Sequence, residues 1–219
     1  MTADVPPDPT ADPTPDPAGA PGSRRPGGRT ARVRAAVLRA TGDLLAEGGL
    51  DRLDPAEVAR RAEVGKTTVY RRWSSPTGLV TDLLAEMAET SLPRTSTGSL
   101  DADLAANADL VARTLSDPRQ GPLFRAVIAA ASTDPGTAAA LRRFYAVRVA
   151  EWAGCVTDAV ARGELPADTD PEEVVRAVSA PLYYRLLTTD LPLDADTATR
   201  AARAAATAAR AGTYARTSP

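Results

Sequence analysis

Four short signals divide this chain into helices. A small polar residue is followed at once by proline at Asp54-Pro55, Ser75-Pro76, Asp134-Pro135 and Asp170-Pro171, and each pair precedes a run with helical spacing of apolar residues. An Asp or Ser side chain caps the free amides of a helix, and proline is tolerated in the first turn because its missing N–H would be unpaired there. No segment alternates with the period of two that a half-buried strand requires. The pattern predicts an all-α fold of about nine helices.

The other helices are predicted from apolar spacing alone. Val33, Val37, Ala40 and Leu44 recur every three or four residues, and the glycines of "EGG" end that helix. Predicted helices begin near residues 30, 55, 66, 76, 99, 121, 135, 171 and 194. Proline removes a hydrogen bond from a helix interior, so we expect Pro181 to kink or interrupt the eighth of them.

Composition excludes several classes of protein. The chain has 219 residues, 43% of them hydrophobic, which is typical of a globular protein. Its apolar runs are too short for a membrane span, and no signal peptide is visible, which predicts a cytoplasmic protein. One cysteine and no histidine leave neither an internal disulfide, nor a Cys/His metal site, nor a histidine general base. We expect no metal and no cofactor.

Charge is divided unevenly along the chain. The formal net charge is -2, but residues 23–73 carry twelve bases and six acids, a net of +6, whereas residues 74–219 carry a net of -4. Residues 1–22 contain four acids and no base, and residues 1–28 are predicted to be a disordered, proline-rich tail. A basic N-terminal segment beside an acidic remainder predicts two regions with different tasks.

The second and third predicted helices suit a helix-turn-helix DNA reader. They are joined by three residues, and Val69 and Trp73 lie one turn apart on the face that would meet a core. Lys66, Thr67 and Arg71 then lie on the opposite face, where such side chains can bind base edges in a major groove. Their neighbours Tyr70 and Arg72 can reach phosphate oxygens.

The stretch "LDPAEVARRAEVGKTTVYRRWSSPTGLV", residues 53–80, resembles the tetracycline-repressor (TetR) family of bacterial transcription regulators. The resemblance implies three N-terminal DNA-binding helices and a C-terminal helical domain that dimerises and holds an effector. It also implies base contacts from Lys66, Thr67, Thr68 and Arg71, and phosphate contacts from Tyr70 and Arg72. Two positions depart from the family pattern. Glu63 stands where the family usually has a turn glycine, and Pro76 where many members have a lysine.

The segment "SRRPGGRTARVR" precedes the first predicted helix. We expect Arg29 and Arg32 to contact DNA phosphates, and the arm has two interpretations: its arginines enter an adjacent minor groove, or they are merely solvated. The expected domains are a DNA-binding domain over 29–74, an effector-binding and dimerisation domain over 75–212, and a tail over 213–219.

The C-terminal region has more apolar helix faces than a DNA-binding domain needs, which favours a ligand site between helices. The candidate pocket residues are Asn107, Phe124, Trp152 and Tyr183. Asn107 either bonds neighbouring groups or remains available to an effector. Few charges fall on the inward faces, which predicts a neutral, hydrophobic or aromatic small molecule.

A single helix-turn-helix motif contacts few base pairs, so we expect a homodimer on a palindromic operator of double-stranded DNA. The expected interface lies on the last two helices, with Val174, Val175, Val178, Leu182 and Leu186. The leading hypothesis is a ligand-released repressor located with the nucleoid. Two alternatives remain: a DNA-binding regulator without an effector, and an all-α enzyme using Glu172-Glu173 or Asp101-Asp103. Those acids sit at helix starts, where they interact favourably with the helix dipole, so the enzyme is the weaker alternative.

Overall fold

A computed structural model describes residues 27–216, and within this range the chain forms nine α-helices and one short 3₁₀-helix. The prediction of an all-α fold is therefore confirmed. The helices are α1 (Gly27–Gly48), the 3₁₀-helix (Leu50–Arg52), α2 (Pro55–Arg61), α3 (Lys66–Arg72), α4 (Pro76–Thr90), α5 (Leu100–Ser116), α6 (Gln120–Ala131), α7 (Pro135–Ala161), α8 (Pro171–Thr188) and α9 (Ala195–Arg210).

The capping residues predicted from the sequence do cap their helices. The side chain of Asp54 accepts a hydrogen bond from the Ala56 amide, and Ser75 accepts one from Gly78. Asp134 and Asp170 bind amides in the first turns of α7 and α8 in the same way, and Asp194, which was not among the predicted caps, does so at the start of α9. Local chemistry therefore determines where most helices begin.

The start of α1 and the course of α8 differ from the predicted ones. Helix α1 begins at Gly27 rather than near Thr30, so residues 27 and 28 are helical and not part of a disordered tail. Residues 1–26, which hold the rest of the predicted tail, lie outside the described residues. Helix α8 is not interrupted by the exposed Pro181 and continues to Thr188, because Val178 and Leu182 on either side of the proline are buried against the other C-terminal helices.

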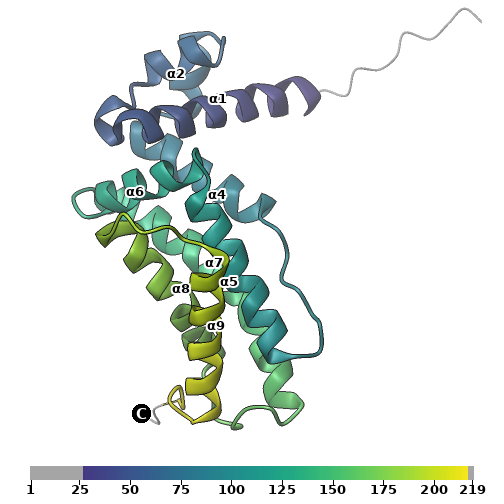
Figure 1. The fold of residues 1–219 in the computed structure, drawn as a ribbon. Helices are drawn as coiled ribbons and strands as arrows, with labels where there is room; N and C mark the ends of the chain where they lie inside the picture. Colours follow the sequence, from purple (N-terminus) through teal and green to yellow (C-terminus); the bar gives the residue numbers. More distant parts are fainter. Residues whose placement is uncertain (1–26, 217–219) are drawn as a thin grey trace, which may run out of the picture.

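Helices α1, α2 and α3 gather at one end of the molecule, and the longer helices α5, α7, α8 and α9 extend away from them (Figure 1). Helix α1 packs against α6, and α4 packs against α7, so two C-terminal helices support the N-terminal end. No helix between residues 27 and 216 is both long and apolar enough to span a membrane.

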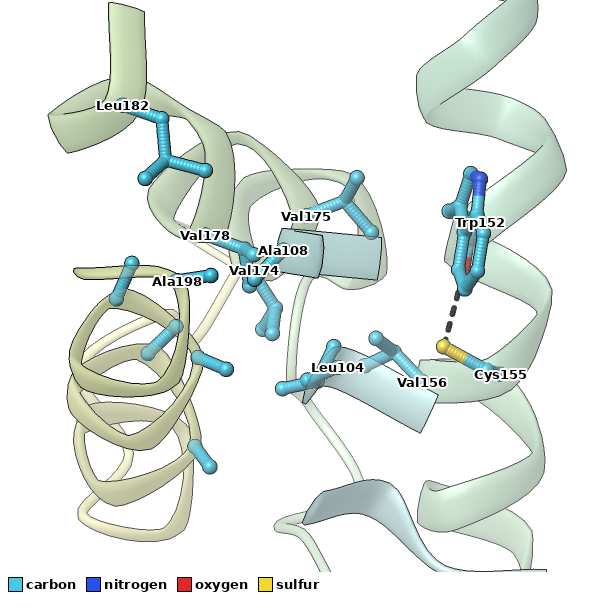
Figure 2. Packing of buried hydrophobic residues seen from close by; sticks show 14 of the residues in the cluster. Leu104, Ala108, Trp152, Cys155, Val156, Val174, Val175, Val178, Leu182 and Ala198 are labelled. Carbon is cyan, nitrogen blue, oxygen red and sulfur yellow. Dashed lines mark hydrogen bonds between the residues drawn. The ribbon is translucent and has the colours of Figure 1, made fainter. Parts of the chain in front are cut away.

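A hydrophobic cluster formed by α5, α7, α8 and α9 holds the C-terminal region together (Figure 2). Alanines such as Ala198, Ala202 and Ala205 form the inward face of α9, and their small side chains permit close approach to α5 and α8. All five residues expected at a dimer interface, from Val174 to Leu186, are buried in this cluster within a single chain. That expectation is wrong for these residues, because the apolar face of α8 packs against its own chain.

A second cluster joins the N-terminal helices to the rest of the molecule. Val37, Val58 and Val69 of α1, α2 and α3 share it with Leu123 of α6 and Leu141 of α7. Helices α1, α2 and α3 therefore share one hydrophobic cluster with residues of α6 and α7 rather than forming a separate core, and α1 is the helix that packs on α6.

Candidate nucleic-acid interface and interior cavity

The turn between α2 and α3 has the geometry of a helix-turn-helix motif. The Val64 amide donates to the Ala59 carbonyl at 3.0 Å, which folds the chain back at the end of α2. Glu63 adopts a positive φ of 55°, in the left-handed region that favours glycine. Glu63 thus occupies the position where the family usually has a turn glycine, and it adopts the conformation that glycine accepts without strain.

Helix α3 has an inner and an outer face, as predicted. Val69 and Trp73 are 0% and 4% exposed, so they anchor the helix in the N-terminal cluster. The predicted contact residues Lys66, Thr67, Tyr70, Arg71 and Arg72 are exposed, and Thr68 is half-buried. The Arg72 guanidinium lies over the Trp73 ring, 5.1 Å from its centroid, while its side chain remains accessible.

The basic side chains of α2 and α3 differ in their pairing. Arg60 binds Glu57 at 2.6 Å, and Arg61 binds Glu47 at 2.5 Å, so the charges of α2 are balanced. Among residues 27–216, Lys66, Arg71 and Arg72 have no ion-pair partner. The surface of α3 therefore carries uncompensated positive charge, which is what a phosphate backbone attracts.

Part of the expected arginine arm is helical. Arg29 and Arg32 lie in the first turns of α1, and the Arg32 side chain donates to the Gly28 carbonyl at 3.2 Å. Arg34 points the other way and binds Asp82 and Glu86 of α4. Arg24 and Arg25 lie outside the described residues.

The start of α1 lies beside α3. A hollow of about 390 Å³ is lined by Arg29 and Thr30 from α1, by Glu63 and Gly65 from the turn, and by Thr68, Arg71 and Arg72 from α3. Arg29 is thus brought to the same surface as Thr68, Arg71 and Arg72, three of the residues predicted to touch DNA.

Asp82 connects α1, α3 and α4. It accepts hydrogen bonds from Trp73 Nε1 at 2.9 Å and from Arg34 Nη2 at 2.6 Å. Burial favours the protonated form of this carboxyl, but the bonds from Arg34 and Trp73 outweigh it and hold the pKa of Asp82 below its usual range. The same contacts raise the pKa of Arg34. The residue that ends α3 is therefore tied to α4 through a charged side chain.

A cavity of about 780 Å³ lies within the C-terminal region, between residues of α4, α5, α6, α7 and α8. Asn107, Phe124, Trp152 and Tyr183, the four residues predicted to form a pocket, all line it. Four aromatic rings meet at the α6 side. Phe124 contacts Phe144 and Tyr183, with ring centroids 5.6 and 6.3 Å apart, and Tyr145 contacts Tyr183 at 5.5 Å. Burial raises the pKa of Tyr145 to about 12, so these phenols are neutral at physiological pH.

Polar groups in the cavity wall are incompletely paired. Asn107 Oδ1 and Trp152 Nε1 are both buried, and neither has a hydrogen-bond partner within residues 27–216. Leaving such groups unpaired costs about 1–3 kcal/mol each. In Figure 2 the indole nitrogen of Trp152 lies at the end of the ring away from Cys155. Contrary to the expectation of few inward charges, the wall also contains Arg148 and Arg176, two residues that sequence reasoning did not assign to the pocket.

The segment between α4 and α5 covers one side of the cavity and is fastened to α7. Arg148 donates to the Leu92 carbonyl at 2.9 Å, and Arg94 binds Asp158 at 2.9 Å. Arg94 crosses α7 at Gly154, where a Cβ atom would approach its guanidinium within 2.9 Å. At its far end the segment is held by Asp103, which accepts from the Thr97 amide at 2.8 Å.

The carboxylates considered for an enzyme have structural partners instead. Asp101 binds Arg210 at 2.7 Å, and Glu172 and Glu173 both bind Arg176. Cys155 is fully buried, and burial raises the pKa of its thiol to about 11, so it is not an activated nucleophile.

Two family models match the chain. The model described as "Bacterial regulatory proteins, tetR family" matches residues 37–83, and "Tetracyclin repressor-like, C-terminal domain" matches residues 94–205. The first covers the helix-turn-helix and the second covers most of the cavity wall.

Individual relatives agree with these matches. The chain is 34% identical to the uncharacterised HTH-type transcriptional regulator YdeS of Bacillus subtilis, over 70% of this chain and 78% of that protein. It is 32% identical to the DNA-binding transcriptional repressor TetR of Mycobacteroides abscessus, over 73% of this chain and 84% of that protein. Among solved structures, that of the TetR family transcription regulator SCO0332 matches the fold of this chain with a TM-score of 0.64. The match covers 80% of this chain and 97% of that one, with 31% sequence identity.

The exposed basic face of α3, its buried apolar face and the matches along both parts of the chain lead to one conclusion: the protein belongs to the TetR family of helix-turn-helix, DNA-binding transcriptional regulators and is not an enzyme.

Proposed function

We propose that the protein is a dimeric repressor that binds a palindromic operator in the cytoplasm and is released from it by a small effector in the interior cavity. The observation that carries this proposal is the position of the cavity. Its wall includes Met87 of α4 and Phe124 of α6, two helices that also pack in the N-terminal cluster beside α1. A ligand that moved either helix would move the DNA-reading end. The similarity to a named repressor of Mycobacteroides abscessus supports the direction of regulation.

The outer face of α8 and the segment that follows it support a homodimer. Tyr184 and Leu187 lie about one turn apart on α8 and are 69% and 46% exposed, and Leu191, three residues after the helix ends, is 60% exposed; these three residues are the apolar patch of α8. Exposed apolar patches of this kind mark interfaces. Two copies related by a twofold axis would present two α3 helices to half-sites about 34–36 Å, or a multiple of that distance, apart.

The cavity also distinguishes this proposal from a regulator whose C-terminal region only dimerises. A wall with neutral aromatic rings and unpaired Asn107 and Trp152 atoms favours a bound small molecule with a hydrophobic or aromatic body. A C-terminal region without a cavity would have favoured a regulator that has no small-molecule effector.

The experiment that tests DNA reading is selection of binding sites from random duplex DNA at fixed, near-physiological salt, followed by titration of the enriched sequence. We expect a palindrome bound with submicromolar affinity. Arg71→Ala or Lys66→Ala should weaken binding by about 1–3 kcal/mol and relax preference at one base pair of each half-site. Tyr70→Phe removes a phosphate contact and should weaken all sequences similarly.

Equal weakening of every sequence by Arg71→Ala would contradict its assignment to a base. An absence of any enriched sequence would contradict the proposed repressor itself.

A further inference from the structure

The charges in the cavity wall are all of one sign. Arg148 and Arg176 belong to the wall, and no Asp or Glu residue lines it. A hollow with cationic and without anionic groups attracts anions and repels cations. The sign of the wall therefore restricts which molecules the cavity accepts.

Arg176 does not contribute free charge, because it is paired. Its guanidinium binds Glu172 at 2.5 Å and Glu173 at 2.8 Å, both on the outer side of α8. Arg148, in contrast, has no ion pair among the described residues, and its guanidinium makes one hydrogen bond there, to the Leu92 carbonyl. An arginine has five N–H donors, so most of those on Arg148 remain available.

Arg148 is half-buried, and that environment disfavours an unpaired charge. Burial lowers the pKa of Arg148, and the nearby charge of Glu151 only partly opposes this effect. Glu151 itself accepts a hydrogen bond from the Arg94 amide on the exposed side of α7. An anion brought into the cavity would supply the partner that Arg148 lacks.

The neighbours of Arg148 on α7 define what surrounds that anion. Phe144, Arg148 and Trp152 follow one another at intervals of four residues, so they lie along one face of the helix, and all three line the cavity. Phe144 belongs to the aromatic group with Phe124 and Tyr183. Trp152 offers a buried N–H without a partner. A charged group at Arg148 would thus have an aromatic region on one side and a free donor on the other.

We propose that the effector is a monocarboxylate with an apolar or aromatic body, whose carboxylate binds Arg148 and whose body lies against Phe124, Phe144 and Tyr183. This inference rests on the proposed function, because it specifies the ligand of the same regulatory cavity. A carboxylate effector differs from the neutral molecule that the sequence led us to expect, and a cavity with this charge should not bind organic cations. Arginine suits a carboxylate because its planar fork donates two parallel hydrogen bonds to the two oxygens.

The test compares molecules of the same shape that differ in charge. 2-Naphthoate is paired with 2-naphthamide, and octanoate with octanamide, and binding to the full chain is measured by calorimetry. We expect the carboxylate of at least one pair to bind about tenfold or more tightly than its amide, because only the carboxylate makes charge-assisted bonds to Arg148. The same carboxylate should release the protein from its selected operator at lower concentration than the amide does.

Three variants test whether the preference for the carboxylate depends on Arg148. Arg148→Gln should reduce the preference for the carboxylate to within about twofold, and Arg148→Lys, which keeps the charge but not the fork, should retain part of it. Arg143→Gln is the matched control, because Arg143 is an exposed arginine of α7 that does not line the cavity. It removes the same charge and should leave the preference unchanged. Circular dichroism establishes that each variant is folded.

Equal binding of carboxylate and amide, or a preference that survives Arg148→Gln, would overturn the inference. So would the failure of both members of both pairs to bind at millimolar concentration. The proposed repressor is judged separately, by operator binding without any ligand. If the protein binds its operator but prefers neutral ligands, the proposed repressor stands and only the inference of a carboxylate effector fails.

Discussion

Glu63 has a positive φ, and it is the one non-glycine residue of the described range with such a value. A side chain in the left-handed region costs roughly 1–2 kcal/mol, because its Cβ approaches the following carbonyl oxygen. The residue also lines the hollow beside Arg71 and Arg72, where its negative charge opposes binding to a phosphate backbone. Glu63 therefore affects both stability and DNA affinity, by two separable mechanisms.

Substitution at this position separates the two mechanisms. Glu63→Gly should raise the free energy of unfolding by about 1 kcal/mol in urea titrations, because glycine accepts the positive φ without strain. Glu63→Ala keeps the strain and should leave stability nearly unchanged. Both remove the charge, so both should tighten operator binding. A glycine variant no more stable than the alanine variant would show that the turn is not strained.

Among the elements, α4 connects the DNA-reading end to the cavity. It begins at Pro76, three residues after Trp73, and its residues Met87 and Thr90 line the cavity wall. Asp82, near its middle, accepts bonds from Trp73 and Arg34. Asp82→Asn should lower the free energy of unfolding by about 1–3 kcal/mol, because the amide offers one acceptor and turns a donor toward Arg34.

The pH dependence of stability tests whether the charged form of Asp82 causes this loss. The pKa of Asp82 is lowered in the folded protein from an unfolded value of 3.8, so its contribution is complete above that pH and is lost as pH falls through the lower, folded pKa. Thermal melts should show a gap between the wild type and Asp82→Asn at pH 7 that narrows below about pH 4. Glu89→Gln is the control, since Glu89 is exposed on the same helix and has no ion pair among residues 27–216. A gap independent of pH would exclude the charged form of Asp82 as the cause.

Elements whose limits depend on local chemistry were predictable from the sequence, and those set by tertiary contacts were not. Asp54, Ser75 and Asp134 cap their helices because an oxygen beside a free amide needs no distant partner. The continuation of α8 through Pro181 depends on the burial of Val178 and Leu182 against other helices, a tertiary contact that periodicity does not reveal. The same holds within the sites. The four pocket candidates do line one cavity, but Arg148 was not among them, because only packing brings an arginine of α7 under the Leu92 carbonyl.

At the scale of the whole molecule, the proposed dimer makes a direct prediction. Leu187→Glu places a charge in the exposed patch of α8 and should convert the dimer to a monomer in light scattering, because a charge in an apolar interface loses its hydration. Val147→Glu is the control, since Val147 is similarly exposed, at 53%, but lies on α7. The monomer should bind its operator at least about tenfold more weakly, since it reads a single half-site. Equal dimerisation of both variants would place the interface elsewhere.

The hydrophobic cluster at the N-terminal end limits the exchange of domains between proteins of this family. It joins Val37, Val58 and Val69 to Leu123 of α6 and Leu141 of α7. A chimera joined between residues 74 and 75 would place a new reading head on helices α6 and α7 whose side chains match a different partner. The surfaces at that junction would have to be redesigned together, or the head would have to be transferred with α4, α6 and the start of α7. New operator specificity is therefore obtained more readily by changing the outer face of α3 than by exchanging domains.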